Sequence, residues 1–509
     1  MIKNILQMLE KSALEAPQSI ALSDENGLLT YSEVVEASKA IGTKIAFLNN
    51  LKEPVAVLLD KTKMALLAFF GIVYSGNFYI PIDVEMPNTR IAKIFSTVHP
   101  FAIITDTEYI EKAETLSKEC GFNLAIINCN EAVNVQINDA LLKQIRDKAI
   151  DTDPVYALFT SGSTGTPKGV VCCHRSVIDY ADWLIDTFSF DKNTIIGNQA
   201  PFYFSMSVLD IFATIRSGAH LHIIPKKMFS FPANLLEHLN EKKINTIYWV
   251  PTALCIVANT RVLDKIKMPF LKTILFAGET MPTKQLNIWR KNLPNVLYAN
   301  LFGPTEITDI GIYYIVDRDF SDDEPLPIGR ECDNVDAIIL NPDSTKLAQK
   351  GEIGELCIRG SFLAMGYYNN PAKTSEAFIQ NPLNSHYPEI IYRTGDLVSV
   401  NERGEMMYHG RKDFQIKHKG NRIELGEIEN AAFAVPGIES CACIYDKEKE
   451  RIVLFFQGEN VDNRLIRDFM KQIVPSYMIP NVMLKMTDMP KNQNGKIDRK
   501  SLVEYYQNL

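Results

Sequence analysis

Residues 158–170, "LFTSGSTGTPKGV", leave an apolar strand and enter a loop rich in hydroxyls and glycines that ends on one lysine. Glycines let a backbone approach an oxyanion closely, hydroxyls and free N–H groups donate hydrogen bonds to it, and the lysine adds positive charge. The loop differs from the GxxxxGK[ST] phosphate loop, because Pro167 precedes the lysine and Gly169 follows it. The stretch predicts a phosphate-binding turn after a strand of an α/β protein, although a surface loop with a chance lysine has the same composition. The candidate residues are Thr160, Ser161, Gly162, Ser163, Thr164, Gly165 and Lys168.

Short apolar runs alternate with helical patterns on both sides of this loop. We expect buried strands at 55–59, 101–105, 124–128, 155–159, 220–224, 246–250 and 273–277. Amphipathic stretches lie between several of them, for example Ser207–Arg216 and Pro282–Lys291. This alternation predicts parallel sheets covered by helices.

The pattern changes twice towards the C-terminus. Residues 310–410 show short strands and Gly/Pro/Asn turns, and after Asp413 a compact α+β pattern follows, with strands near 441–446 and 451–458 and a helix over 463–474. A chain of 509 residues is too long for one hydrophobic core. The predicted fold is α/β: a large N-terminal domain, residues 1–412, of αβ-layered subdomains plus a β subdomain, and a small α+β C-terminal domain, residues 413–509.

Composition excludes several classes of function. The net charge of -8, from 53 basic and 61 acidic residues, argues against nucleic-acid binding. No apolar run approaches the ~18 residues of a membrane span, and Lys3, Glu10 and Lys11 interrupt the start where a signal peptide needs an apolar run. Nine cysteines without a CxxC pair fit thiols in a reducing compartment. We therefore expect a soluble cytoplasmic protein.

Further stretches follow the loop in a fixed order: "NLFGPTE" (300–306), "GELCIRG" (354–360), "YRTGDLV" (392–398), "GRKDFQIKHKGNRIELGEIE" (410–429) and "NGKIDRK" (494–500). With "LTYSEV" (29–34) and "FYIPID" (78–83), they resemble the ordered motifs of the adenylate-forming superfamily over essentially the whole chain. The closest resemblance is to stand-alone adenylation domains of nonribosomal peptide synthetases and to D-alanine–carrier-protein ligases. It implies an ATP-dependent, AMP-forming acid–thiol ligase with a mobile C-terminal lid.

The resemblance also implies roles for individual residues towards ATP and Mg²⁺. The loop around Ser161, Thr164 and Lys168 holds the outer phosphates, and the catalytic residues are Lys496, Thr305 and Glu306. Thr305 contacts the α-phosphate, Glu306 holds Mg²⁺, and Lys496 on the closed lid bridges the substrate carboxylate and the α-phosphate. Taken alone, "GPTE" is an ordinary helix start and Lys496 an ordinary terminal lysine. The remaining expected nucleotide contacts are Gly278, Asn300, Phe302 (stacked on adenine), Gly303, Asp396 (on the ribose hydroxyls) and Arg411.

The resemblance also implies roles for two positions in the movement of the lid and the binding of the carrier arm. Asp413 is the hinge on which the lid turns. Gly420 lines the tunnel for the phosphopantetheine arm of the carrier. An ordinary loop aspartate and a hairpin glycine are equally compatible with the sequence at these two positions.

The acid pocket departs from the pattern of amino-acid-activating relatives. Those relatives have FDxS here, with an Asp that pairs with the α-ammonium of the substrate, whereas this chain has Ser205 in "YFSMS". A hydroxyl does not replace that ion pair. Asp309 is unexpected in a mostly apolar wall, because an unpaired buried carboxylate is costly, so it either faces solvent or meets a donor on the substrate. The positions that align with the pocket are Phe204, Ser205, Met206, Leu209, Tyr248, Leu275, Ala277, Leu301, Asp309 and Ile310.

These observations predict an acid without a standard α-ammonium but with an amine or hydroxyl elsewhere. An aminobenzoate-type aryl acid is the first choice, a β- or ω-amino acid the second, and an α-amino acid held by Asp309 or Asp210 the third. Since no carrier-protein signature occurs in the chain, we expect a separate phosphopantetheine-bearing carrier protein as acyl acceptor. An acyl-CoA ligase and an inactive nucleotide-binding scaffold remain the alternatives. The presence of Lys168, Glu306, Asp396 and Lys496 argues against the scaffold.

Overall fold

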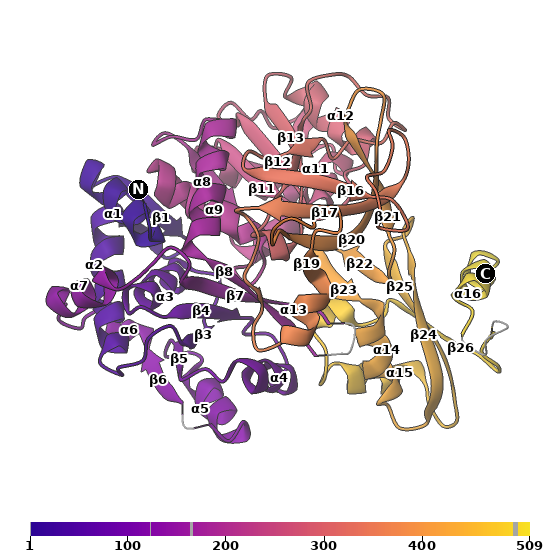
Figure 1. Ribbon diagram of the computed structural model, residues 1–509, viewed down its shortest axis with the longest axis horizontal. Coiled ribbons are helices and arrows are strands. Elements are labelled where there is room, and N and C mark those ends of the chain that lie inside the picture. Colours follow the sequence, from indigo (N-terminus) through magenta and orange to yellow (C-terminus); the bar gives the residue numbers. More distant parts are fainter. Residues whose placement is uncertain (1, 123, 163–165, 492–496) are drawn as a thin grey trace. The chain divides into compact units, whose positions relative to one another are not determined.

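The computed structural model describes residues 2–122, 124–162, 166–491 and 497–509 (Figure 1). Its contacts divide the chain into two compact units. The first comprises the chain up to Val84, His99–Leu158 and Val170–Lys412. The second comprises Glu85–Val98, Phe159–Gly169 and Asp413–Leu509. The boundary between Lys412 and Asp413 thus falls where the resemblance places the hinge.

One large sheet has seven strands in the order β18-β8-β7-β4-β3-β5-β6. The strands from β7 to β6 run parallel, whereas β18 pairs antiparallel with β8. Every residue of β3 and β4 is buried, as expected for parallel strands covered on both faces. The bounds are β3 Pro54–Leu58, β4 Phe78–Ile82, β5 Ala102–Thr105, β6 Ala125–Asn128, β7 Pro154–Thr160, β8 Lys168–Cys173 and β18 Gly366–Tyr367.

A second large sheet has nine strands in the order β15-β14-β13-β12-β11-β9-β10-β1-β2. Its six central strands, β13 to β1, run parallel, and β2, β14 and β15 pair antiparallel at the two ends. The bounds are β1 Ile20–Asp24, β2 Gly27–Thr30, β9 Ile195–Asn198, β10 His220–Ile223, β11 Thr246–Trp249, β12 Thr273–Phe276, β13 Leu297–Phe302, β14 Ile312–Ile315 and β15 Arg330–Glu331.

Two helices of the first unit are buried on all sides along most of their length. α3 is buried from Ala65 to Tyr74 and contacts β1, β3 and β4, while α9 is buried from Met206 to Ile215 and contacts β9, β10 and β11. Figure 1 shows α8 and α9 side by side next to the nine-stranded sheet. The helices are α1 Ile5–Glu15, α2 Tyr31–Ala46, α3 Lys63–Tyr74, α5 Ile110–Glu119, α6 Cys129–Ala132, α7 Asp139–Asp147, α8 His174–Phe188, α9 Met206–Ser217, α10 Pro232–Glu241, α11 Pro251–Asn259, α12 Thr283–Asn292 and α13 Pro371–Ala377, with short 3₁₀ turns η1 Lys226–Ser230, η2 Val262–Asp264 and η3 Thr305–Ile307.

A smaller antiparallel sheet completes the first unit, where the sequence predicts a β subdomain. Its order is β16-β17-β20-β19, with β21 paired to β20. The bounds are β16 Val335–Leu340, β17 Gly354–Gly360, β19 Phe378–Gln380, β20 Ile390–Val400 and β21 Met406–Arg411. None of the helices in the described part of the chain is long and apolar enough to cross a membrane.

The second unit has its own core around Ile428, Leu454 and Met470. Helix α15 ends at Met470, four residues before the predicted end of the helix, and residues 471–473 form turns instead. Pro475 restricts helical backbone only at Val474 and does not account for the earlier end. The elements are α4 Asn88–Val98, β22 Gln415–His418, β23 Asn421–Glu424, α14 Leu425–Phe433, β24 Ile438–Asp446, β25 Arg451–Gly458, α15 Asn463–Met470, η4 Ser476–Met478, β26 Val482–Lys485 and α16 Arg499–Gln507.

The predicted α/β architecture is confirmed. Each of the seven expected strands is present, and its ends lie within one residue of the predicted ends. The two expected helices correspond to α9 and α12. The strands follow from the sequence because each is a short apolar run bounded by polar turns. The edge strands β2, β15 and β18 carry no comparable apolar run and were not predicted.

Candidate active site

The predicted phosphate-binding loop connects β7 to β8, and Ser163, Thr164 and Gly165 lie outside the described residues. The Thr160 hydroxyl is buried and has no hydrogen-bond partner among the described residues. Ser161 Oγ donates to the Arg422 carbonyl oxygen at 2.8 Å within the second unit. A Cβ on Gly162 would lie 2.0 Å from the Thr166 carbonyl oxygen, so only glycine fits. A tight glycine turn beside an unsatisfied buried hydroxyl fits an anionic ligand that accepts hydrogen bonds.

The "GPTE" segment forms a closed loop between β13 and β14. The Gly311 N–H donates to the Phe302 carbonyl oxygen at 3.1 Å, which closes the loop at its base. A Cβ on Gly303 would lie 2.1 Å from the Asp309 carbonyl oxygen, so the two sides of the loop touch at this glycine. The Phe302 ring lies 5.7 Å from the Tyr408 ring. The expected adenine contact is therefore an aromatic side chain at the carboxyl end of a central parallel strand, where α/β proteins bind ligands.

Glu306 is fully buried on the 3₁₀ turn η3. Its Oε1 accepts a hydrogen bond from the Tyr367 hydroxyl at 2.7 Å, and its backbone oxygen accepts one from the Ala364 N–H at 2.9 Å. Tyr367 belongs to β18, and the sequence analysis did not identify it. These contacts hold the carboxylate that we expect to meet Mg²⁺ in one orientation.

Thr305 and Ser205 bring the nucleotide segment and the acid pocket together. Thr305 Oγ1 donates to Ser205 Oγ at 3.3 Å. Ser205 immediately precedes α9, on which Met206 and Leu209 are buried. Phe204 stands one residue earlier, and its ring packs edge-on against Tyr203. At the position where the family resemblance predicts a carboxylate, this chain has a neutral hydroxyl hydrogen-bonded to another neutral hydroxyl.

The remaining pocket positions lie at the carboxyl ends of neighbouring parallel strands. Tyr248 pairs in register with Leu275, and Leu301 lies on the next strand, with Ala277 just after β12. The Sδ atom of Met206 lies 3.4 Å from where a Cβ on Gly278 would stand, so this glycine (φ +91°) leaves room for the methionine. Leu275, Ala277, Leu301 and Ile310 are buried, which gives the predicted apolar walls.

Asp309 is buried rather than exposed, so the reading in which it faces solvent is wrong. Its Oδ2 accepts hydrogen bonds from the Tyr180 hydroxyl at 2.8 Å and the Tyr248 hydroxyl at 3.2 Å. Tyr180 lies on α8 and is absent from the sequence-based site residues. Its ring packs edge-on against Phe362, which fixes its orientation.

The backbone just before Asp309 is strained. Thr308 has φ +71° and ψ −62°, and the Asp309 N–H donates to the Ile307 carbonyl oxygen at 2.8 Å. This is a γ-turn, a rare conformation that costs a β-branched residue about 1–3 kcal/mol. The Thr308 hydroxyl donates to the Phe362 carbonyl oxygen at 2.8 Å and anchors the turn. Such strain is concentrated at functional sites, and here it sets the direction of the Asp309 side chain.

A second buried carboxyl group, Asp210, lies close enough to Asp309 for their charges to interact. Asn198 Nδ2 donates to its Oδ2 at 2.7 Å, and Asp210 Oδ1 has no partner within the described ranges. Burial raises the pKa of Asp210 well above its ordinary value, and the charge of Asp309 raises it further, against the effects of Asn198 and Lys61. Burial therefore favours the protonated form of Asp210, whereas Asn198 and Lys61 favour the charged form.

Two residues expected to contact the ribose contact each other. Asp396 and Arg411 are register partners on β20 and β21, and Arg411 Nη1 lies 2.9 Å from Asp396 Oδ1 in a buried ion pair. Asn300 donates to the Pro327 carbonyl oxygen at 2.8 Å. Gly420, the predicted tunnel residue, has φ +78° and lies in the turn of the β22–β23 hairpin. Oδ1 of Asp413, the predicted hinge residue, accepts a hydrogen bond from the Gln415 N–H at 3.2 Å. Lys496 lies outside the described residues.

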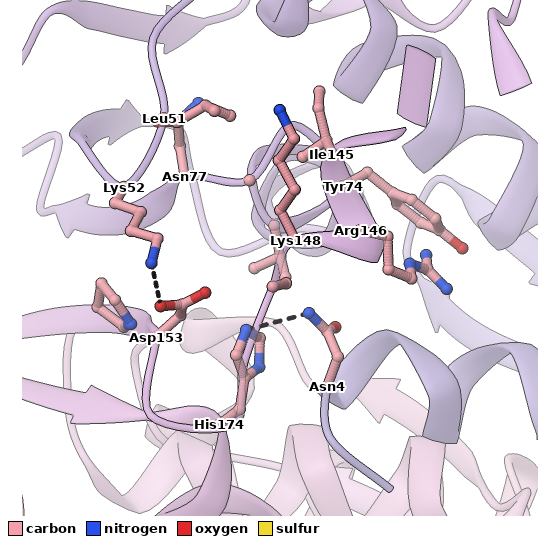
Figure 2. Close-up of a pocket in the computed structure, with 14 residues that line it drawn as sticks. Asn4, Leu51, Lys52, Tyr74, Asn77, Ile145, Arg146, Lys148, Asp153 and His174 are labelled. Carbon is pink, nitrogen blue, oxygen red and sulfur yellow. Dashed lines mark hydrogen bonds and ion pairs between the residues drawn. The ribbon is translucent and has the colours of Figure 1, made fainter. Parts of the chain in front are cut away.

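A cavity of about 50 Å³ lies apart from these residues, at the amino ends of β3, β4 and β7. Figure 2 shows the Lys52–Asp153 ion pair (2.6 Å) on one side and Asn4 next to His174 on the other. His174 Nδ1 accepts a hydrogen bond from the Ile5 N–H at 3.3 Å, and burial lowers the pKa of His174 to about 4. These contacts hold the start of α1 and belong to the fold rather than to the predicted site.

The sequence matches the AMP-binding enzyme family over residues 9–368. It is 30% identical to the zwittermicin A synthase ZmaJ of Bacillus cereus over 98% of this chain and 94% of that protein. It is also 30% identical to the D-alanine–D-alanyl carrier protein ligase of Listeria monocytogenes over 99% of both chains. The fold matches the Vibrio cholerae adenylation domain AlmE, solved with glycyl-adenosine-5'-phosphate, with a TM-score of 0.86, 23% identity, and coverage of 100% of this chain and 98% of that one. The chain belongs to the AMP-binding enzyme family and is an adenylate-forming ligase.

Proposed function

We propose that this enzyme activates a carboxylic acid that carries an amine or a hydroxyl away from its α carbon, with aminobenzoates as the leading class. A carboxylate oxygen attacks the α-phosphorus of ATP, the bond from that phosphorus to the oxygen shared with the β-phosphate breaks, and pyrophosphate leaves. A carrier-protein thiol then attacks the acyl carbon, and AMP leaves with the bridging carboxylate oxygen.

The proposed substrate class follows from the positions of the polar groups around the acid site. Ser205 offers only a hydroxyl, already paired with Thr305, at the position where relatives hold an α-ammonium. The pocket carboxylate is Asp309 instead, held by two phenols at the far wall formed by β11 and α8. A substrate whose donor group is displaced from its carboxylate matches this arrangement, and the flat, apolar walls favour an aromatic ring.

The described nucleotide residues support binding of ATP with Mg²⁺. The buried Thr160 hydroxyl supplies a hydrogen-bonding group beside the Gly162 turn for the outer phosphates, together with Lys168. Glu306 supplies one oriented carboxylate, and nucleotide-bound Mg²⁺ takes only one or two carboxylates besides phosphate oxygens and water. Mg²⁺ would supply positive charge that offsets the charge developing on pyrophosphate.

A separate carrier protein is the proposed acyl acceptor. The similarity to a carrier-protein ligase over 99% of both chains supports this choice over free coenzyme A. A second candidate substrate, D-alanine, follows from the same similarity. It requires Asp309, rather than residue 205, to hold the amine.

ATP–pyrophosphate exchange with a panel of acids tests the proposal. We expect the fastest exchange with amino-substituted benzoates, slower exchange with unsubstituted benzoate, and slow exchange with either enantiomer of alanine. Preference for D-alanine would select the second candidate. Absence of exchange with every acid would contradict the proposed activity. Detection of the acyl thioester on purified carrier proteins, against free coenzyme A, distinguishes the two acceptors.

A further inference from the structure

We propose that Tyr180, together with Tyr248, is a positioning residue that holds the Asp309 carboxylate towards the acid pocket and thereby sets a preference for substrates that carry an amine. This inference rests on the proposed function, because it specifies which substituent the same acid site selects. It concerns a residue of α8 that belongs to none of the motifs.

The geometry makes Tyr180 the closer of two donors to one carboxylate oxygen. Its hydroxyl lies 2.8 Å from Asp309 Oδ2, against 3.2 Å for the Tyr248 hydroxyl. The two phenols come from different elements, α8 and β11, so the carboxylate is fixed between a helix and the end of a parallel strand. Fixing a carboxylate from two directions restricts its rotation before a substrate binds.

Both phenols remain donors throughout the working pH range. Burial raises the pKa of Tyr180 and of Tyr248 well above the ordinary value, and the negative charge of Asp309 raises both further. A phenol that keeps its proton donates to an anionic oxygen and stabilises its charge without cancelling it. The wall formed by these residues therefore presents a carboxyl group whose Oδ2 accepts hydrogen bonds from two phenols.

The backbone fixes the carboxylate as well. The γ-turn at Thr308 sets the direction of the next residue, and its hydroxyl is anchored on the Phe362 carbonyl oxygen. The Tyr180 ring packs edge-on against Phe362 too, so the turn and the phenol share one support. Strain, phenol donors and packing all act on the direction of the Asp309 side chain.

Asp210, the other buried carboxyl group, has different hydrogen-bond partners. Among the described residues, the Asp210 carboxyl group accepts a hydrogen bond from Asn198 Nδ2 at 2.7 Å and none from a phenol, and burial raises its pKa. Of these two buried carboxyl groups, only Asp309 has phenol donors that favour a charged oxygen. An amine gains an ion pair there, whereas a hydroxyl gains only a hydrogen bond and an unsubstituted ring gains neither.

The test compares Tyr180→Phe with Tyr156→Phe in full-length protein. Tyr156 is a matched control, because it is buried in the same unit and lies close enough to Asp309 to interact with it, yet it donates no hydrogen bond to Asp309 within the described residues. ATP–pyrophosphate exchange is measured with an aminobenzoate and with benzoate, and kcat and KM are determined for each. We expect Tyr180→Phe to reduce the preference for the amino-substituted acid by about tenfold, mainly through KM, the loss that one hydrogen bond to a charged group produces. Tyr156→Phe should leave the preference unchanged.

A double-mutant cycle separates positioning from a general structural effect. In an Asp309→Asn background, Tyr180→Phe should change the preference no further, because the charge that it positions is already gone. An unchanged preference in Tyr180→Phe, or an equal loss for both acids, overturns the inference. Wild-type protein that exchanges pyrophosphate with none of the acids refutes the proposed function instead, so the two failures are distinguishable.

Discussion

Ser205 Oγ and Thr305 Oγ1 lie 3.3 Å apart, and this contact joins the acid pocket to the segment expected to bind the α-phosphate. The family resemblance implies that amino-acid-activating members have at position 205 a carboxylate that pairs with the substrate α-ammonium. Here Ser205 and Thr305 place two hydroxyls at this point, and the carboxyl group proposed to face the substrate is Asp309, which accepts hydrogen bonds from Tyr180 and Tyr248. Moving the charge within the pocket moves the expected position of the amine on the substrate.

Replacing Ser205 by aspartate should reverse this arrangement. Ser205→Asp places a carboxylate at the α-ammonium position, so exchange with an α-amino acid should rise about tenfold and exchange with an aminobenzoate should fall. Ser205→Ala is the matched control, since it removes the hydroxyl without adding charge. Unaltered acid preference in Ser205→Asp would show that residue 205 does not face the substrate.

Lys496 should act in only one half-reaction. Lys496→Ala should slow pyrophosphate exchange by about 10²–10³-fold, because a charge aimed at the reacting centre is lost, while transfer from a supplied acyl-adenylate to a thiol should persist. Lys500→Ala, an exposed lysine at the start of α16, is the control and should leave both half-reactions intact. Equal loss in both half-reactions would contradict the assigned role.

The loop at Gly303 should tolerate no side chain. A Cβ there would lie 2.1 Å from the Asp309 carbonyl oxygen and 2.7 Å from the Ile310 Cα, so Gly303→Ala must displace the backbone of Asp309 and Ile310 or of Gly303 itself. Activity should fall by more than about tenfold while the unfolding temperature changes little. Gly351→Ala, where the Cβ meets open space but the backbone is left-handed (φ +82°), controls for backbone strain without a clash and should keep its activity. Normal activity in Gly303→Ala would show that this loop does not position catalytic groups.

A chain of histidines should make stability depend on pH. His220 Nε2 and His222 Nδ1 each lie 2.7 Å from Ser23 Oγ, and His222 Nε2 lies 2.8 Å from His238 Nε2. Burial lowers the pKa of His220 to about 4 and, with the neighbouring His238, that of His222 to about 3. The unfolded chain binds protons below about pH 6.5 that the folded chain excludes, so stability is full above that pH and is lost as the pH falls towards 4.

Thermal unfolding measured between about pH 7.5 and pH 5.5 checks this expectation. The unfolding temperature should fall with pH, and His222→Asn should flatten the dependence while lowering stability at neutral pH. His386 is exposed, so His386→Asn should change neither quantity. A pH dependence that survives intact in His222→Asn would mean that other groups are responsible.

The sequence predicts the sheets well because their strands are short apolar runs with sharp polar boundaries, as at 55–59 and 273–277. It does not predict Tyr180, because a tyrosine on an amphipathic helix gives no sign of which buried group its hydroxyl will meet. The sequence also leaves open whether Asp309 is buried or exposed. Its burial depends on the γ-turn at Thr308 and on contacts with Tyr248 and Tyr180, which lie more than 60 positions away in the sequence. Tyr367 was missed for the same reason: its strand β18 is two residues long and has no pattern of its own.

Transfer of labelled oxygen tests the central claim most directly. The enzyme is incubated with ATP, Mg²⁺, a carrier protein and an aminobenzoate labelled with heavy oxygen in its carboxylate, and the nucleotide products are analysed by mass spectrometry. The account predicts AMP that contains one heavy oxygen, because the carboxylate attacks the α-phosphorus and its bridging oxygen leaves with AMP. Heavy oxygen in phosphate or pyrophosphate, or AMP without any label, would contradict it.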